Sequence, residues 1–309
     1  MLVLLLFLIS LLPVVFFLRH IYVADRYERE PIRSVLLAFF LGAASCFPAI
    51  VIELLLDRII PTAPGLVSAV LQSFIKIAPA EEASKLVFVL LFLYRTPNFN
   101  EENDGLVYTS AVALGFAGLE NVFYVVSGGV SVGVARAITA IPLHYFTGIV
   151  MGYYIGLSKF NESKKWSLIA KGFLLAYFFH AIYDTFALSG TAAALLIVPC
   201  VVLLFFIGRR LEKKGAELSR DRWTGVVLPE RALDVKRPSV IMVVASRFLI
   251  GGSCLFWVLA LWGNSGSKHP VDVLSIVFGC IIITFLPLLL AILLEFLYAK
   301  RRRTYLARG

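Results

Sequence analysis

Among the ionisable residues that interrupt the apolar stretches of this sequence, seven have types and spacing that are suited to hydrolytic chemistry. They are Glu81, Glu82, Lys85, Glu120, His144, His180 and Asp184. Lys85 follows the two adjacent glutamates by four and three residues, so one face of a helix would carry all three side chains. An ionised side chain in hydrocarbon costs at least about 2.5–3.5 kcal/mol, and such residues therefore need partners or a task.

Together, carboxylates and imidazoles can activate water as a general base, protonate a leaving amine or hold a divalent metal. Glu and His are suitable zinc ligands, and an open fourth position would generate hydroxide near neutral pH. Each signal is weak alone, because a Glu–Lys pair can be structural and a lone residue such as His144 can be a packed, hydrogen-bonded histidine. Their joint occurrence on successive apolar stretches is what favours an active site.

The elements that position these residues are long apolar runs. The chain has 309 residues, 60% hydrophobic and only 16% charged, with a mean hydropathy of +0.87. A run near twenty residues spans about 30 Å as a helix, the thickness of the hydrocarbon core of a bilayer. We therefore predict an all-α, polytopic transmembrane bundle of about nine spans: Leu2–Leu18, Val35–Ile52, Gly65–Tyr94, Leu106–Ser127, Ala137–Leu157, Gly172–Ser189, Thr191–Ile207, Ser239–Trp262 and Val271–Leu294. Pro79, in the first half of the third run, suggests a re-entrant piece there.

The basic residues predict the orientation of the chain. The loops after spans one, three, five and seven, with the carboxyl tail, contain 23 of the 29 Lys and Arg, whereas the opposite loops contain Arg58, Arg136 and Lys268. This asymmetry places the N-terminus outside and the C-terminus in the cytoplasm. It also accounts for the net charge of +9 without a nucleic-acid partner. We expect a multi-pass protein of the cell membrane.

The polar segment near residue 209 divides the chain. We predict a seven-span core over residues 1–208, a cytoplasmic linker over 209–238, and a two-helix membrane hairpin with a basic tail over 239–309. At 1.5 Å per residue, Glu82, Glu120, His144 and His180 lie about 10–14 Å below the outer face of the membrane. The candidate site is therefore expected in the outer half of the bilayer.

The ordered motifs resemble the PrsW family of intramembrane proteases, distant relatives of the CAAX prenyl endopeptidases. The resemblance rests on EEASK at 81–85, FAGLEN at 116–121, His144 and HAIYD at 180–184, and it covers roughly residues 35–189. It implies cleavage of a single-span membrane protein, such as an anti-sigma factor, on its extracytoplasmic side. CAAX-type relatives have His where this chain has Glu120, so prenylated substrates are disfavoured.

On this basis we predict an integral membrane endopeptidase. One glutamate, with Glu81 favoured over Glu82, acts as general base, while the other pairs with Lys85. The remaining assignments place Glu120, His144 and His180 around a divalent metal such as zinc, or directly around the water and oxyanion, with Asp184 orienting His180. Two other readings stay open: an ion- or proton-coupled transporter, in which intramembrane ionisable residues are also typical, and a non-catalytic membrane scaffold.

Overall fold

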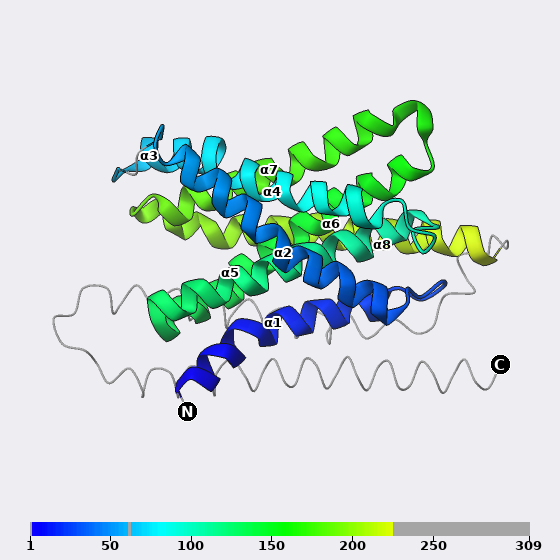
Figure 1. Cartoon of the computed structure of the whole chain (residues 1–309), viewed down its shortest axis with the longest axis horizontal. Coiled ribbons are helices and arrows are strands. Elements are labelled where there is room, and N and C mark those ends of the chain that lie inside the picture. The colour runs from blue at the N-terminus through cyan, green and yellow to red at the C-terminus, as the bar shows by residue number, and fades with distance from the viewer. Residues whose placement is uncertain (1, 61–62, 225–309) are drawn as a thin grey trace. The chain divides into compact units, whose positions relative to one another are not determined.

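The described part of the chain, residues 2–60 and 63–224 of a computed structural model, contains helices and no strand (Figure 1). The helices are α1 (Leu2–Ala24), α2 (Ile32–Leu56), α3 (Leu66–Leu71), η1 (Gln72–Ile77), α4 (Ala78–Phe88), η2 (Val89–Leu93), α5 (Glu102–Ile138), α6 (Ala140–Lys159), η3 (Glu162–Lys164), α7 (Lys165–Leu188), η4 (Ala192–Leu196) and α8 (Ile197–Thr224). The all-α prediction is confirmed for these residues. The last two predicted spans lie outside them.

Four helical stretches in the described residues are long and apolar enough to cross a membrane: Ile32–Leu56, Glu102–Lys159, Glu162–Leu188 and Ala192–Thr224. The second of these contains both α5 and α6. A shorter apolar helical stretch covers Ser10–Ala24. These helices support a polytopic membrane protein, while the count of nine spans and the orientation of the termini remain predictions.

The third predicted span is helical from Leu66 to Leu93. The backbone continues from α3 through the π-helix η1 into α4, so Pro79 does not break the helix and no re-entrant turn precedes it. A proline within a helix lacks an amide donor, and its ring clashes with the carbonyl four residues earlier. The wide π turn that ends at Ile77, two residues before Pro79, accommodates this conflict.

Helix α5 changes direction near its C-terminal end. Gly129 has a φ of +77°, which ends the regular helix and starts a second helical piece that runs to Ile138. An L side chain rarely adopts this backbone conformation, and glycine adopts it freely. The turn coincides with the predicted loop between the fourth and fifth spans.

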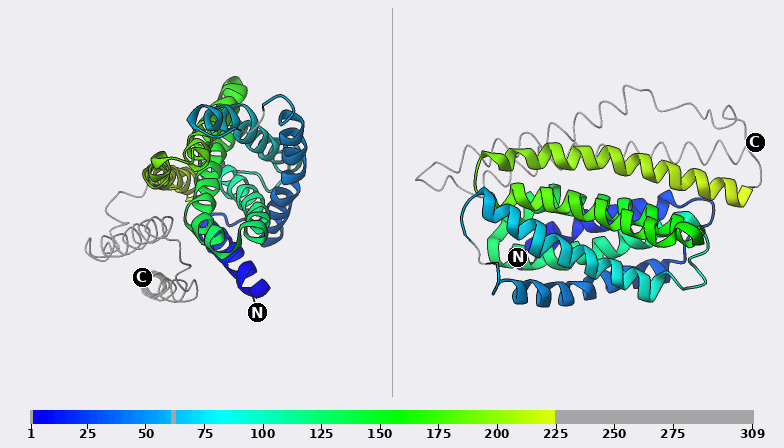
Figure 2. Two further views of the ribbon diagram at one scale, coloured as in Figure 1. Left: turned by 90° about the vertical axis from the view of Figure 1, so that its left-hand side faces the viewer. Right: turned by 90° about the horizontal axis from the view of Figure 1, so that it is seen from above.

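In this part of the protein the helices run side by side and make close contacts with one another (Figure 2). A Cβ atom on Gly156 of α6 would lie only 1.9 Å from the backbone oxygen of Glu102 on α5, and one on Gly42 of α2 would lie 1.9 Å from that of Val112. Small residues at such contacts are typical of helix packing in membranes, because packing and interhelical hydrogen bonds replace hydrophobic burial there.

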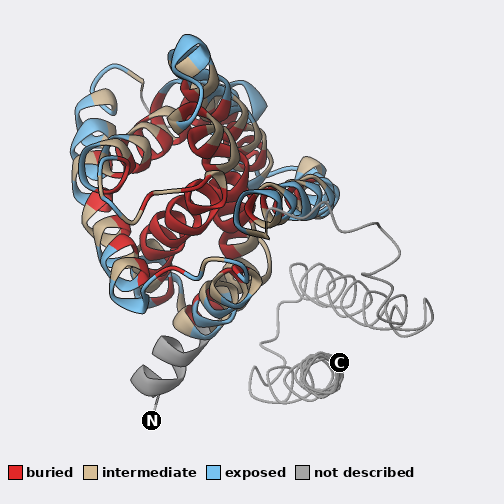
Figure 3. Ribbon diagram, turned by 90° about the vertical axis from the view of Figure 1, so that its right-hand side faces the viewer, coloured by how far each residue is buried: buried red, intermediate tan, exposed pale blue. Residues whose placement is uncertain are grey.

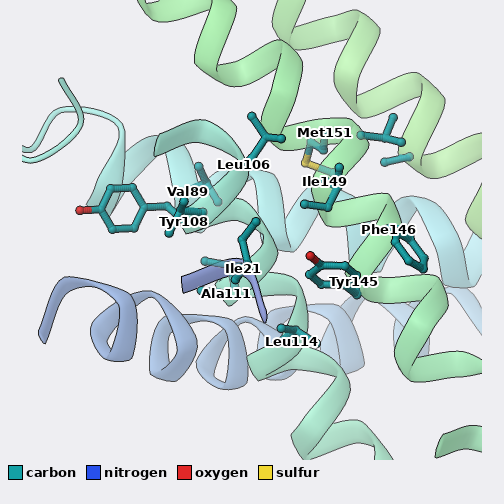
Figure 4. Close-up of a cluster of buried hydrophobic side chains, with 14 of the residues drawn as sticks. Ile21, Val89, Leu106, Tyr108, Ala111, Leu114, Tyr145, Phe146, Ile149 and Met151 are labelled. Carbon is teal, nitrogen blue, oxygen red and sulfur yellow. The ribbon is translucent and has the colours of Figure 1, made fainter. Parts of the chain in front are cut away.

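The burial of side chains follows the packing of the helices. Buried residues lie on the faces where the helices meet, and exposed residues lie on the outer faces (Figure 3). Side chains from α1, α5 and α6 make up much of the core, among them Ile21, Tyr108, Leu114, Tyr145 and Met151 (Figure 4). The outer faces carry large apolar side chains such as those of Phe40 and Phe47 on α2. Apolar outer faces of this kind are suited to contact with lipid.

Helix α8 extends well into the predicted linker. It continues past residue 208 as far as Thr224, and its charged half makes specific contacts with other helices. Glu212 accepts a hydrogen bond from Tyr145 at 2.6 Å, and Ser219 donates one to Glu101 at 2.7 Å. The chain divides into two compact units between Val226 and Val227, and all described residues belong to the first unit. The domain boundaries at 208 and 238 remain predictions.

Candidate active site

The seven residues singled out in the sequence lie together in one cluster. Glu81, Glu82 and Lys85 come from α4, Glu120 from α5, His144 from α6, and His180 with Asp184 from α7. The histidines, Glu82 and Lys85 are at most 2% exposed, and the rings of the two histidines meet edge to face with centroids 4.9 Å apart. Contact between these side chains, which belong to four different helices, also places them at one level along the bundle.

Lys85 lies at the centre of the cluster. Its Nζ atom is 2.7 Å from Glu82 Oε1 and 3.4 Å from Glu81 Oε2, and it also contacts His144 Nδ1 at 3.0 Å. The ammonium group lies 4.1 Å from the centroid of the Phe116 ring, within range of a cation–π interaction. Lys85 therefore pairs more closely with Glu82 than with Glu81.

His180 is held by carboxylates on both sides of its ring. Glu82 Oε1 is 2.7 Å from Nδ1, while Asp184 Oδ2 and Glu81 Oε2 are 3.3 Å and 3.7 Å from Nε2. A carboxylate at one ring nitrogen fixes the tautomer and leaves the other nitrogen available. The contact geometry thus gives Glu82 the position at Nδ1 that an orienting carboxylate takes, with Asp184 beside Nε2.

His144 contacts Glu120, which is held in turn by an arginine. Glu120 Oε2 is 3.0 Å from His144 Nε2, and Glu120 Oε1 is 2.7 Å from Arg136 Nη2. Arg136 also donates from Nε to Asn121 and stacks over Tyr124, with Cζ 3.8 Å from the ring centroid. Both ring nitrogens of His144 therefore have polar neighbours, Lys85 at Nδ1 and Glu120 at Nε2.

Sequence reasoning missed Arg136 as a member of the cluster. Its position before an apolar run and outside every motif predicts a loop residue, whereas the structure places it in the second helical piece of α5. The signal that pointed to it is its isolation, since it is one of three basic residues in the loops predicted to face outward. A second missed residue is Glu53 of α2, which interacts electrostatically with Glu120, Asp184 and His180.

Comparison with known proteins identifies the family. A family model described as PrsW family intramembrane metalloprotease matches residues 30–208, more than half of the chain. The chain belongs to the PrsW family. The matched segment contains all seven predicted site residues, together with Arg136.

Curated PrsW proteins are similar over most of their own length. Protease PrsW of Geobacillus kaustophilus is 36% identical over 178 residues, which are 57% of this chain and 77% of that protein. Protease PrsW of Bacillus subtilis is 31% identical over 213 residues, which are 67% of this chain and 94% of that protein. No solved structure matches the chain. The family and these relatives establish that the chain is a membrane-embedded protease.

A metalloprotease needs a set of metal ligands, and the cluster contains such a set. Glu81, His144 and His180 each offer one ligand atom, these atoms lie within 4.8 Å of one another, and all three residues are buried. Two imidazoles and a carboxylate are a ligand set of catalytic zinc sites, so the residues fit such an ion by chemistry and by proximity. The ligand set predicted from the sequence contains Glu120 instead of Glu81. In the structure, Glu120 contacts Nε2 of His144.

Proposed function

We propose that this PrsW family protein is a cell-membrane metalloprotease that hydrolyses a membrane-anchored protein, with zinc held by Glu81, His144 and His180. The observation that carries this proposal is the compact, buried arrangement of the three ligand atoms on α4, α6 and α7. A zinc ion there would supply Lewis acidity and a water molecule that is acidic enough to lose a proton near neutral pH.

The other residues have roles that follow from their contacts. Glu82 accepts a hydrogen bond from His180 Nδ1 and thereby directs Nε2 of that ring toward Glu81 and Asp184. Lys85 compensates the charge of Glu82. Arg136 binds one oxygen of Glu120 and leaves the other, Oε2, facing His144.

We assign general-base catalysis to Glu120. Its Oε2 atom would accept the proton of the attacking water and pass that proton to the leaving amine of the cleaved peptide bond. This assignment exchanges the roles that the sequence suggested for Glu81 and Glu120. The proximity of Glu81 to both histidines supports this exchange. The two assignments also predict different metal contents for a variant that lacks the Glu81 carboxylate and a variant that lacks the Glu120 carboxylate.

The substrate we propose is a single-span membrane protein, in the manner of an anti-sigma factor, cut near its extracytoplasmic side. Two arguments support it. The excess of Lys and Arg in alternate loops predicts that the cluster lies in the outer half of the bilayer, and the membrane-embedded cluster suits a substrate that is itself held in the membrane.

The test combines metal analysis with cleavage of a single-span reporter by the full-length protein in liposomes. We expect about one zinc per chain in the wild type, loss of cleavage on chelation, and recovery when zinc is restored. Glu81→Gln should lose both metal and cleavage, whereas Glu120→Gln should keep the metal and lose cleavage.

Two results would count against the proposal. Metal-free wild-type protein with chelator-resistant cleavage would leave the glutamates to activate water without an ion. Loss of metal in Glu120→Gln with retention in Glu81→Gln would restore the ligand set suggested by the sequence. His144→Ala/His180→Ala serves as the matched variant that lacks both imidazoles.

A further inference from the structure

A second group of carboxylates lies far from the candidate active site. Glu28 and Glu30 belong to the segment that joins α1 to α2, and Asp104 lies in the first turn of α5. Asp104 and Glu120 are separated by about 24 Å along α5 at 1.5 Å per residue. Each of the three acidic residues offers one oxygen, and these oxygens lie within 4.8 Å of one another. This acidic group is therefore distinct from the ligand set of the protease.

Each member of the acidic group has a buried carboxylate oxygen that no N–H or O–H group of the protein reaches: Glu28 Oε2, Glu30 Oε1 and Asp104 Oδ1. Glu30 and Asp104 also lie within hydrogen-bonding range of each other, which two ionised carboxylates can use only by sharing a proton or a cation. Glu30 and Asp104 are only 1% and 0% exposed. Their other oxygens are well satisfied, since Tyr108 donates to Glu30 Oε2, while the backbone N–H groups of Asn100 and Glu101 donate to Asp104 Oδ2 at 2.6 and 2.8 Å. Buried acceptors without a donor are uncommon and require an explanation, such as an ion.

No ion pair involves these three carboxylates within residues 10–60 and 63–224, where side chains are described. The cations nearby contact other groups: Arg29 donates to the backbone oxygen of Asp25, and Arg222 pairs with Glu102. Lys159 acts on Asp104 electrostatically but donates its hydrogen bond to the backbone oxygen of Tyr94. Carboxyl groups thus cluster here without a protein cation in contact.

Other acidic residues add to this accumulation. Asp25 Oδ2 accepts the backbone N–H of Glu30 at 2.8 Å, so a further carboxylate lies directly beside the group. Burial, together with the charges of Glu28 and Asp25, raises the pKa of Glu30 to about 7. Clustered carboxylates of this kind favour either a bound cation or protonation.

We propose that Glu28, Glu30 and Asp104 bind a hard divalent cation, Ca²⁺ or Mg²⁺. Both ions prefer oxygen ligands, and the group offers carboxylate oxygens from three residues. Oxygens that share one Ca²⁺ ion at about 2.4 Å cannot be more than about 4.8 Å apart, which agrees with the proximity of the three ligand atoms. Water would complete the coordination.

The bound ion would tie the α1–α2 connection to the start of α5. Asn103 already links these two segments through a 3.1 Å hydrogen bond to Asp25. Glu101, directly before α5, accepts hydrogen bonds from Ser219 and Trp223 of α8. The ion would therefore stabilise the end of the bundle at which three elements meet, independently of the catalytic chemistry.

A proton shared between Glu30 and Asp104 is the rival explanation, and the two make different predictions. A shared proton needs no divalent ion, and neutralising Glu28 would then relieve repulsion whether or not Ca²⁺ or Mg²⁺ is present. A bound ion requires the charge of Glu28, and its loss would weaken the response to the ion.

The first experiment measures thermal unfolding of the full-length protein in detergent, stripped of metal and then titrated with CaCl₂ or MgCl₂. We expect a saturable rise in Tm of roughly 5–10 °C at a hundredfold excess of ion over its Kd. Glu28→Gln should abolish most of this rise, because it removes a charged ligand of the ion. Glu28 is only partly buried, so the variant should still fold. The matched control, Glu162→Gln, removes a carboxylate of the connection between α6 and α7 and should respond as the wild type does.

A second measurement uses Tb³⁺ as a luminescent probe, excited through Tyr108, whose hydroxyl contacts Glu30. Sensitised emission that Ca²⁺ or Mg²⁺ displaces, and that Glu28→Gln and Asp104→Asn reduce, supports the site; the more effective competitor identifies the ion. The proposal is overturned if Tm does not respond to either ion, or if Glu28→Gln responds as strongly as the wild type. Ion-independent stabilisation by Glu28→Gln would instead establish the shared proton.

Discussion

Arg136 Nη2 lies 2.7 Å from Glu120 Oε1, although the turn at Gly129 separates the two residues along α5. The chain reverses after Gly129 and thereby brings the Arg136 guanidinium back beside the Glu120 carboxylate. An ion pair of this kind compensates the charge of Glu120 next to Glu81 and Asp184. Arg136 is therefore placed to position Glu120 for the general-base role that we propose for it.

Replacing Arg136 with Gln should lower the rate of peptide cleavage by about 10–100-fold without removing the metal. Without the guanidinium, the Glu120 carboxylate loses its closest cation and the orientation that leaves Oε2 toward His144. The measurement is kcat and KM on the reporter substrate, with metal content determined in parallel. Arg58→Gln, an exposed arginine, is the control. Wild-type kcat in Arg136→Gln would show that Glu120 needs no such partner.

Glu82 should matter more for metal affinity than Asp184 does. Glu82 Oε1 lies 2.7 Å from His180 Nδ1, whereas Asp184 lies beside the opposite nitrogen. Loss of a carboxylate that orients a ligating histidine typically lowers metal affinity about 10–100-fold. Competition with a chromophoric chelator would compare Glu82→Gln with Asp184→Asn. A larger loss of affinity in Asp184→Asn would assign the orienting role to Asp184, as the sequence had suggested.

The residues of the candidate site could be predicted because ionisable groups are rare and costly inside apolar helices. This cost made Glu81, Glu120, His144 and His180 visible without any structure. The contacts between these residues were harder to predict. A helical spacing of four suggested that Asp184 orients His180, whereas the nearer partner, Glu82, comes from another helix. Contacts between helices depend on rotation and depth, which spacing along one helix does not determine.

The fold was predictable to a similar extent. Long apolar runs predicted the helices, but the charged residues after 208 suggested a linker where α8 continues to Thr224. Composition alone does not distinguish a solvated helix from a loop. The acidic group of Glu28, Glu30 and Asp104 also escaped prediction, because charged residues near the ends of spans are ordinary until the fold buries them.

The contact between α2 and α5 makes a prediction about stability. A Cβ atom at Gly42 would lie 1.9 Å from Val112 O, so Gly42→Ala should force the two helices apart and destabilise the protein by about 1–3 kcal/mol. Gly118→Ala in α5 is the matched control, because its Cβ would meet side chains of α1 no closer than 3.6 Å. Thermal unfolding in detergent should separate the two variants. Equal Tm values would contradict the tight contact.

The folded core could end at residue 208 or at residue 226, and the two boundaries predict different outcomes when the chain is truncated. The family match ends at residue 208, whereas contacts from α8 to the rest of the bundle continue beyond it. These contacts include Glu212 with Tyr145 at 2.6 Å and Arg222 with Glu102 at 2.7 Å. A chain of residues 1–226 keeps them, and a chain of residues 1–208 loses them.

We therefore expect residues 1–226 to fold and to cleave the reporter, and residues 1–208 to unfold at a clearly lower temperature. The reason is that Tyr145 and Glu101 would lose their hydrogen-bond partners on α8 at buried positions, and each such loss costs about 1–3 kcal/mol. Glu212→Gln in the full-length chain tests one of these contacts alone and should give a smaller decrease in Tm. If residues 1–208 were as stable and active as residues 1–226, the charged half of α8 would be dispensable and the boundary suggested by the sequence would stand.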